Sequence, residues 1–221
     1  GLKTAIIEML SGANVKVDTA TFKNDTVNIH SKDDVLTYMI HLGYLGYDFS
    51  HKSVFIPNNE IRGEFVNAVS VSQWGEVSKA LKNSADLLNA IWRKDEEKVA
   101  VYMEQAHFET SHLQYNNENA LSYTVSLALY AARNFYQVYR EFPSGSGFAD
   151  IVYLPRKEFP DKPALIVELK WNKSAEGAIH QILKKQYFQN LEDYSGNMLL
   201  VGINYDLKTR KHECKILEFK K

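Results

Sequence analysis

Two apolar segments indicate the fold most strongly: Phe-Ala-Asp-Ile-Val-Tyr-Leu at residues 148–154 and Ala-Leu-Ile-Val-Glu-Leu-Lys at residues 164–170. Both are apolar enough to form buried strands, yet the first carries Asp150 and the second carries Glu168 and Lys170. The intervening residues contain three prolines and several polar turn formers. We therefore predict an antiparallel hairpin whose two strands are joined by a long loop.

The charged residues of this hairpin predict a metal site. Residues two apart on a strand point the same way, so Glu168 and Lys170 share a face of the sheet. Antiparallel pairing would bring Asp150 opposite Glu168. A buried charge is costly unless it has a partner or binds a metal. We therefore expect two carboxylates that hold a divalent cation, with an ammonium group beside them.

The sequence around the hairpin predicts further elements in a definite order. A long apolar helix is expected over residues 119–138 and a short strand over residues 139–142. After the two charged strands, Ser174 is a suitable N-cap for a second amphipathic helix. Two apolar strands are then expected over residues 197–203 and 213–219. The order is helix, three strands, helix, strand, with one strand added at the end.

This Asp…Glu-x-Lys pattern, in this order of elements, resembles the PD-(D/E)XK nuclease superfamily. Residues 181–187, Gln-Ile-Leu-Lys-Lys-Gln-Tyr, are similar to the helix that follows Glu-x-Lys in many members. The resemblance implies an α/β (α+β) fold with a restriction-endonuclease-like core, in the order αβββαβ, whose mixed central sheet is flanked by helices. It implies a nuclease-like domain over residues 116–221, preceded by a small, mostly helical domain over residues 1–115.

The resemblance also implies roles for particular residues. It implies Mg²⁺, for which Mn²⁺ can substitute, bound by three carboxylates and one backbone carbonyl: Glu118, Asp150, Glu168 and Leu169. It implies catalysis by the two strand carboxylates, the lysine and an amide: Asp150, Glu168, Lys170 and Gln181. Lys170 would activate the water and stabilise the transition state, and Gln181 would orient the water or the phosphate. Nucleic-acid contacts would come from three lysines and a tyrosine: Lys173, Lys184, Lys185 and Tyr187.

The sequence departs from the superfamily pattern at three positions. Close relatives often have tyrosine and histidine on the first helix where this chain has Leu121 and Ser122, and arginine is frequent where Phe148 stands. If the histidine helps to bind phosphate or metal, its absence predicts a slower, differently selective or inactive site. Two functions therefore stay open: a metal-dependent nuclease acting on DNA rather than RNA, and a catalytically inactive nuclease-fold module that binds nucleic acid or protein.

A narrower resemblance involves the N-terminal part of the chain. Residues 33–65 and the Val-Gly-Ile-Asn-Tyr-Asp segment at residues 201–206 look like a bacterial family in which an AAA-type ATPase-like domain precedes the nuclease domain. This implies the ATPase-like domain of the same full-length protein as a partner. The phosphate-binding pattern Gly-x-x-x-x-Gly-Lys-Ser/Thr is absent from the 221 residues. We therefore expect no ATP site in them.

Composition places weaker limits on function. Residues 1–115 hold 11 Lys/Arg and 15 Asp/Glu, whereas residues 116–221 hold 15 and 12. The C-terminal half is thus basic enough to be compatible with DNA as a partner. The single cysteine, Cys214, excludes an internal disulfide and is compatible with a cytoplasmic location. Since no run approaches the length of a membrane span, we expect no membrane partner. A homodimer is compatible with the resemblance, because duplex-cutting members are often dimers.

Overall fold

The computed structural model describes residues 1–22, 29–71, 75–109, 118–144, 147–188, 191, 194 and 196–220. The chain divides into two compact units, residues 1–78 and residues 79–221. Among the described helices, none combines the length and apolar character needed to cross a membrane.

The first unit combines short helices with a small antiparallel sheet. Its elements are α1 (Leu2–Leu10), β1 (Val15–Lys16), the 3-10 helix η1 (Thr19–Thr21), α2 (Lys32–His41), β2 (Gly46–Asp48), β3 (Ser53–Phe55) and α3 (Asn59–Val71). The strand order is β1-β3-β2. Ser31 caps α2 by accepting a hydrogen bond from the Asp34 amide, and the Asp34 side chain accepts from the Ser31 amide. This capping box fixes where α2 begins.

The second unit is built on a five-stranded mixed sheet. Its helices are most of α4 (Gly75–Trp92), α5 (Glu96–Glu109), α6 (Glu118–Ala128), the 3-10 helix η3 (Tyr130–Asn134) and α7 (Ala175–Lys185). Its strands, in spatial order, are β4 (Tyr136–Ser144), β5 (Gly147–Pro155), β6 (Ala164–Trp171), β7 (Met198–Asp206) and β8 (Lys211–Phe219). Among the described strands of this sheet, β6 and β7 pair in parallel and the other neighbours are antiparallel. From α6 to β7 the α-helices and strands follow the order αβββαβ, with β8 added at the end, which confirms the predicted fold class.

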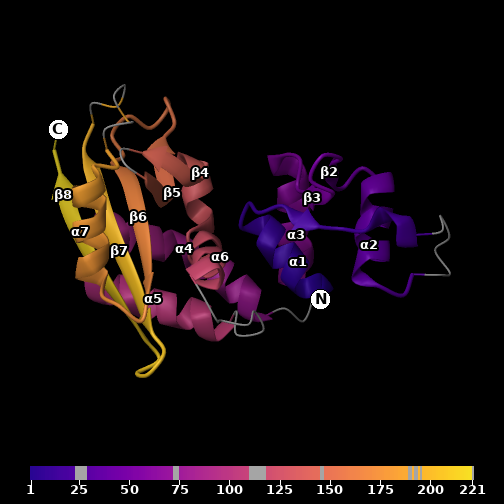
Figure 1. The fold of residues 1–221 in the computed structure, drawn as a ribbon, viewed down its shortest axis with the longest axis horizontal. Helices are drawn as coiled ribbons and strands as arrows, with labels where there is room; N and C mark the ends of the chain where they lie inside the picture. Colours follow the sequence, from indigo (N-terminus) through magenta and orange to yellow (C-terminus); the bar gives the residue numbers. More distant parts are fainter. Residues whose placement is uncertain are drawn as a thin grey trace. The chain divides into compact units, whose positions relative to one another are not determined.

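Helices cover both faces of this sheet. Helix α7 packs on β6, β7 and β8 on one face, and Figure 1 shows α5 and α6 on the other. Strand β6 lies between these layers, and all residues from Ala164 to Lys170 are buried. A strand covered on both faces has apolar residues without alternation, as expected for the parallel centre of an α/β sheet. Glu168 and Lys170 interrupt that apolar run.

The helix predicted over residues 119–138 is wrong in its second half. Helix α6 ends at Ala128, η3 follows, and β4 begins at Tyr136. Apolar side chains nevertheless remain buried beyond Ala128, with Leu129 and Ala132 in the core, so the hydrophobic spacing continues through the change of structure. Periodicity therefore failed to locate the end of the helix. The strand predicted over residues 139–142 lies inside the longer β4.

The compact units divide before the domain boundary that the sequence predicts at residues 115 and 116. Helix α5 contacts both β8 and α6, and the Lys94 ammonium donates to Glu218 at 2.8 Å. The indole N–H of Trp92 donates to the Tyr136 hydroxyl at 2.7 Å. These contacts place α5 and most of α4 in the same compact unit as the sheet.

Candidate active site

Strands β5 and β6 separate at the two predicted carboxylates. Their antiparallel register contains Tyr153 opposite Leu165, Val152 opposite Ile166 and Ile151 opposite Val167, and then stops. The next residue along β5 is Asp150, and the next along β6 is Glu168. Each strand keeps its other neighbour, since β5 continues to pair with β4 and β6 with β7. The sheet therefore opens beside these two acids.

The Asp150 side chain bridges the two strands where the backbone pairing ends. Its Oδ2 accepts a hydrogen bond from the backbone amide of Leu169 at 2.7 Å, while the side chain stays half-buried. The bond ties the start of the opening to β6 and orients the carboxylate. The Leu169 backbone amide is thus hydrogen-bonded to a carboxylate of the predicted site. The role of its carbonyl as a metal ligand stays a prediction.

Glu168 is at the centre of a buried polar cluster. The Lys170 ammonium donates to Glu168 Oε1 at 2.8 Å, with 10% of the lysine side chain and 2% of the glutamate side chain exposed. The Gln181 amide nitrogen on α7 donates to the same oxygen. Glu168 and Lys170 share a face, as the strand alternation predicts. Two donors on one oxygen stabilise the charged form of the carboxylate in a buried setting.

Gly202 allows α7 to come close enough for this contact. It lies opposite Glu168 in the parallel register, and a Cβ added there would collide with the Ala175 carbonyl oxygen and lie 2.9 Å from the Ala178 Cβ. Helix α7 begins directly after Ser174, because the Ser174 hydroxyl accepts a hydrogen bond from the Gly177 amide at 3.0 Å. The predicted N-cap is confirmed. The bare backbone of Gly202 thus helps to place Gln181 over β6.

Asn204 fixes the turn between β6 and α7, a role that the sequence analysis missed. Its Oδ1 accepts from the Lys173 amide at 3.0 Å, and its Nδ2 donates to the Lys173 carbonyl at 3.3 Å. Asn204 is 1% exposed and lies opposite Lys170 in the register. The only sign of this role in the sequence is that a polar amide side chain stands within the apolar segment of residues 198–205.

Tyr187 supports Gln181 from within the core. The side chain is fully buried, and its hydroxyl accepts from the Gln181 amide nitrogen at 3.0 Å. Burial raises the pKa of the phenol, the hydrogen bond from Gln181 opposes that shift, and the charges of Glu168 and Asp150 raise the pKa further. A buried side chain has no direct access to a phosphate backbone, so the geometry favours positioning over nucleic-acid contact.

The other predicted site residues are distributed around the cluster. Lys184 is exposed near the end of α7, and Lys173 is tied by its backbone to Asn204. The Lys185 ammonium lies beside Gly147, where an added Cβ would be 2.9 Å from it. Glu118 is the first residue of α6, and its side chain lies outside the described part of the structure. Its predicted role as a ligand therefore stays a prediction.

Ser122, which stands where relatives often have histidine, binds an arginine from the sheet. Arg140 on β4 donates to the Ser122 hydroxyl at 2.8 Å, and its guanidinium lies 4.7 Å from the centre of the Tyr123 ring. Arg140 is paired with Ile151, the residue after Asp150. A fixed cation thus lies at this part of the sheet, and no sequence pattern singled it out.

The two strand carboxylates fit a magnesium site that has few protein ligands. Among the described side chains, no group of three or more His, Cys, Asp or Glu is arranged to hold a metal ion. Mg²⁺ is commonly bound through one or two carboxylates, with water and substrate phosphate filling the other positions. Asp150 and Glu168 supply those two carboxylates at the opening of the sheet. The residues present therefore fit the ion without a third protein carboxylate.

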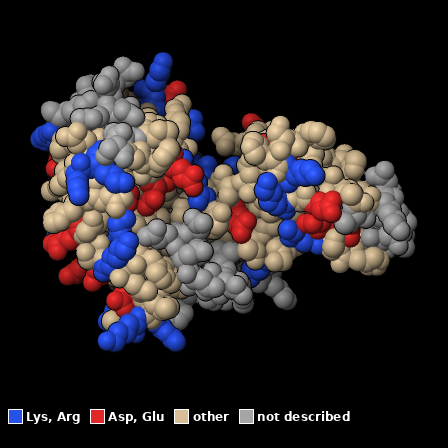
Figure 2. Space-filling view, viewed as in Figure 1, with Lys and Arg blue, Asp and Glu red and all other residues tan. Residues whose placement is uncertain are grey.

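Charge is distributed without a dominant sign on the face shown in Figure 2, where basic and acidic side chains are interspersed. A surface of this kind does not select nucleic acid by its overall field. On this face, contact with a phosphate backbone would depend on particular lysines and arginines.

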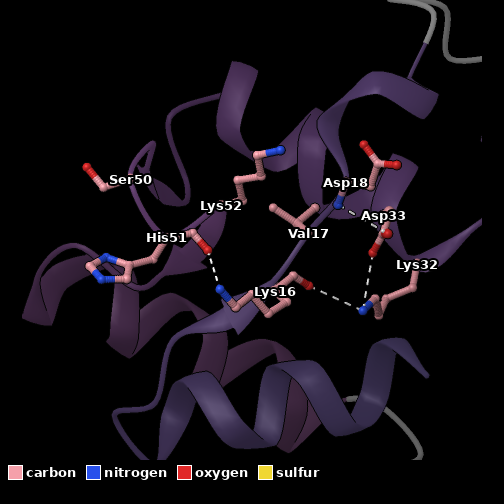
Figure 3. A pocket seen from close by; sticks show the side chains of 8 residues that line it. All are labelled: Lys16, Val17, Asp18, Lys32, Asp33, Ser50, His51 and Lys52. Atoms are coloured by element: carbon pink, nitrogen blue, oxygen red, sulfur yellow. Dashed lines mark hydrogen bonds and ion pairs between the residues drawn. The ribbon is translucent and has the colours of Figure 1, made fainter.

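A separate pocket of about 480 Å³ lies in the first unit (Figure 3). It is lined by Lys16, Val17, Asp18, Lys32, Asp33, Ser50, His51 and Lys52. The Lys16 ammonium donates to the His51 carbonyl at 2.6 Å, and Lys32 pairs with Asp33 at 3.2 Å. The ammonium groups of Lys16 and Lys32 therefore already have partners within the pocket lining.

Comparison with known proteins finds one family model that matches the part of the chain containing the sheet opening. Residues 117–215 match the family model of the PD-(D/E)XK nuclease superfamily. No curated protein and no solved structure matches the chain. The matched residues include Asp150, Glu168, Lys170 and Gln181. The resemblance expected from the sequence is thus confirmed for this part of the chain.

Proposed function

We propose that this chain hydrolyses phosphodiester bonds of nucleic acid, DNA in preference to RNA, with Mg²⁺ as the cofactor and Mn²⁺ as a substitute. The observation that carries the proposal is the separation of β5 from β6 at Asp150 and Glu168, beside the buried Lys170 ammonium. The match of residues 117–215 to the nuclease superfamily supports the same reading.

Each residue of the opening has a part in this reaction. Asp150 and Glu168 would hold the cation, which when bound lowers the pKa of a water molecule and offsets charge on the phosphate. Lys170 places a positive charge where the phosphate gains negative charge during attack. Gln181 holds Glu168 in place from α7, and Tyr187 holds Gln181. Asn204 keeps the turn after Lys170 fixed.

An inactive module that binds nucleic acid or protein is the second candidate. One contact favours it: Glu168 Oε1 already accepts from both Lys170 and Gln181, and these donors compete with a cation for that oxygen. Against it, a buried ion pair rarely stabilises a fold more than apolar residues of the same size would. A pair kept between two helical layers therefore favours a chemical role.

The partners predicted from the sequence belong to the same proposal. DNA is the proposed substrate, and the ATPase-like domain of the full-length protein is the proposed regulator of access to it. The second of these rests on residues 33–65, whose sequence resembles the ATPase-containing family. A homodimer would suit a duplex substrate, because two sites then face two strands.

Cleavage of end-labelled oligonucleotides tests the proposal. Wild-type protein should cut DNA when Mg²⁺ or Mn²⁺ is added and should be inactive in a chelator. Asp150→Asn keeps an oxygen for the Leu169 amide but removes the charge, so cutting should fall by at least about 100-fold while the fold is retained. Equal cutting by wild type and Asp150→Asn would assign the activity to a contaminant. Binding without cutting on DNA and RNA alike would favour the inactive module.

A further inference from the structure

Three segments of the first unit form the walls of its pocket. They are the end of β1, the start of α2 and the turn that joins β2 to β3 (Figure 3). Of the eight described lining residues, Val17 alone is apolar, and the turn residues 50–52 are exposed. Pockets for small organic ligands are mostly apolar, with few polar groups. A pocket of about 480 Å³ with so polar a lining therefore suits a strongly charged ligand.

Positive charge predominates in this lining, which holds three lysines and two aspartates. The Asp33 carboxylate is engaged inside the protein, because it pairs with Lys32 at 3.2 Å and accepts a hydrogen bond from the Asp18 amide at 3.2 Å. The Asp18 carboxylate accepts from the Ala20 amide at 3.0 Å. The two acids thus help to hold the walls of the pocket in place. The ligand that the lining favours is an anion.

Lys52 carries the cation that is most available to such an anion. Within the described part of the chain, its ammonium has no hydrogen bond or ion pair, and Figure 3 draws dashed contacts from Lys16 and Lys32 but none from Lys52. Its backbone is left-handed, with a φ of 47°. Glycine adopts this conformation more easily than an L-residue does. A lysine at this position of the turn, with its ammonium free in a pocket lining, suggests a role for its side chain.

Lys16 and Lys32 can bind the same anion without losing their present contacts. An ammonium group has three N–H donors. Lys16 uses one of them on the His51 carbonyl at 2.6 Å. Lys32 uses two, one on Asp33 and one on the Lys16 carbonyl at 3.4 Å. Each lysine therefore keeps at least one donor for a ligand.

We propose that this pocket binds phosphate groups of the DNA backbone, with Lys52 as the main contact and Lys16 and Lys32 beside it. Lysine binds phosphate as a point charge, and a phosphate contact reads no bases. Because the turn side of the pocket is exposed, a polymer chain can reach it. The proposal rests on the proposed function for the identity of the partner. It gives the DNA a second contact, in the unit of the chain that does not contain Asp150.

Fluorescence anisotropy of the 221-residue chain with a labelled DNA duplex, in a chelator so that no cutting occurs, tests the proposal. Lys52→Gln should weaken binding by about threefold to tenfold and reduce the slope of log affinity against log salt by about one, as expected for one lost phosphate contact. The loss should be the same on a duplex of unrelated sequence. Lys52→Arg keeps the charge and should bind within about twofold of wild type.

Lys157→Gln is the matched control. Lys157 is also an exposed lysine with no hydrogen bond or ion pair to the rest of the described chain, but it lies in the loop between β5 and β6. Its substitution should change neither the affinity nor the salt slope. Lys52→Gln that binds as tightly as Lys157→Gln would overturn the proposal. So would Lys52→Arg that binds as weakly as Lys52→Gln.

Asp18→Asn tests the sign of the charge in the pocket. It removes a negative charge from the lining and keeps an oxygen for the Ala20 amide. Binding of the duplex should therefore strengthen by about twofold to threefold. Weaker binding by a folded Asp18→Asn protein would contradict a site for phosphate.

Inorganic pyrophosphate separates the DNA backbone from a small phosphate compound as the ligand. A ligand that binds the folded chain raises its Tm. Stabilisation of wild type by pyrophosphate that Lys52→Gln loses, with equal DNA binding by both proteins, would assign the pocket to a small phosphate compound and overturn the proposal.

Cutting of the same duplex with Mg²⁺ distinguishes this proposal from the proposed function. Cutting that Asp150→Asn abolishes, together with unchanged DNA binding in Lys52→Gln, overturns the role of the pocket and leaves the nuclease proposal standing. DNA binding that Lys52→Gln weakens, without cutting under any metal, supports the pocket and overturns the nuclease proposal. Failure of wild type to bind the duplex overturns both.

Discussion

The Lys170 ammonium and Glu168 Oε1 are 2.8 Å apart, and both side chains lie almost completely inside the protein. They occupy the central strand of a sheet that is covered by helices on both faces, a place where most residues are apolar. The pair adjoins the point at which β5 leaves β6. Its position thus couples the stability of the core to the proposed chemistry.

The first prediction concerns this pair. Lys170→Met leaves the Glu168 carboxylate buried without its cation and should lower the free energy of unfolding by about 3 kcal/mol. The double variant Glu168→Gln/Lys170→Met carries no buried charge there and should be more stable than Lys170→Met. Urea unfolding measures both. Lys184→Met, at an exposed position of α7, is the control and should shift stability by less than about 0.5 kcal/mol. A double variant less stable than Lys170→Met would contradict the prediction.

The second prediction concerns Gly202. Gly202→Ala places a methyl group against the Ala175 carbonyl and should destabilise the protein by about 1–3 kcal/mol, because α7 must move outward. The same movement should withdraw Gln181 from Glu168 and reduce cutting. Gly63→Ala is a matched control within α3, where an added Cβ meets nothing within 4 Å. It should raise stability by about 0.5–1 kcal/mol, as alanine does inside a helix. Thermal denaturation of both variants decides the point, and similar shifts would contradict the account.

The third prediction concerns two histidines in contact, His212, which is buried, and His107, which is half-buried. The His107 and His212 rings lie 5.3 Å apart, and each packs on Tyr205. Burial lowers the pKa of His107 to about 4 and that of His212 to about 3, the latter also through His107. Both values lie below the ordinary histidine pKa of about 6.5. At a pH between the folded and unfolded pKa values, the unfolded chain therefore binds more protons than the folded chain. Stability should therefore fall as the pH drops from 6.5 toward 4.

The slope of this loss tests the histidine pair. His212 should contribute up to about 1.4 kcal/mol per pH unit over this range. His212→Phe should remove that contribution, whereas His180→Gln, at an exposed position of α7, should leave the profile unchanged. Urea unfolding midpoints measured every half pH unit give the comparison. A profile that is equally steep in His212→Phe would assign the acid sensitivity to other groups.

The fourth prediction concerns Asn204. Asn204→Ala removes both partly buried hydrogen bonds to the Lys173 backbone and should cost about 1–3 kcal/mol. The turn that follows Lys170 would loosen, so cutting should fall more than metal affinity does. Metal affinity that falls as strongly as cutting would show that Asn204 acts on the carboxylates instead.

The sequence predicted the parts of the site that depend on local pattern. Alternation along β6 placed Glu168 and Lys170 on one face, and the turn-rich loop after β5 predicted the antiparallel register. The Ser174 cap located the start of α7 and hence the position of Gln181. Each of these follows from residues close together in the chain, where strand and helix geometry determine direction.

Contacts between segments that are distant in the chain could not be predicted from the sequence. The bond between Asn204 and Lys173, the contact of Arg140 with Ser122 and the close packing of α7 on Gly202 depend on how sheet and helices pack. The end of α6 was missed for a related reason. Apolar spacing reports burial, and burial continues through the change from helix to strand at Tyr136.

Isothermal titration of Mn²⁺ into the purified chain, beside Asp150→Ala and Asp150→Asn, measures metal binding at the sheet opening without any knowledge of the substrate. We expect wild type to bind Mn²⁺ and both variants, while folded by circular dichroism, to lose the binding. Wild-type protein that is folded and binds no metal at millimolar concentration, or binding that both variants retain, would contradict a metal site at Asp150 and Glu168.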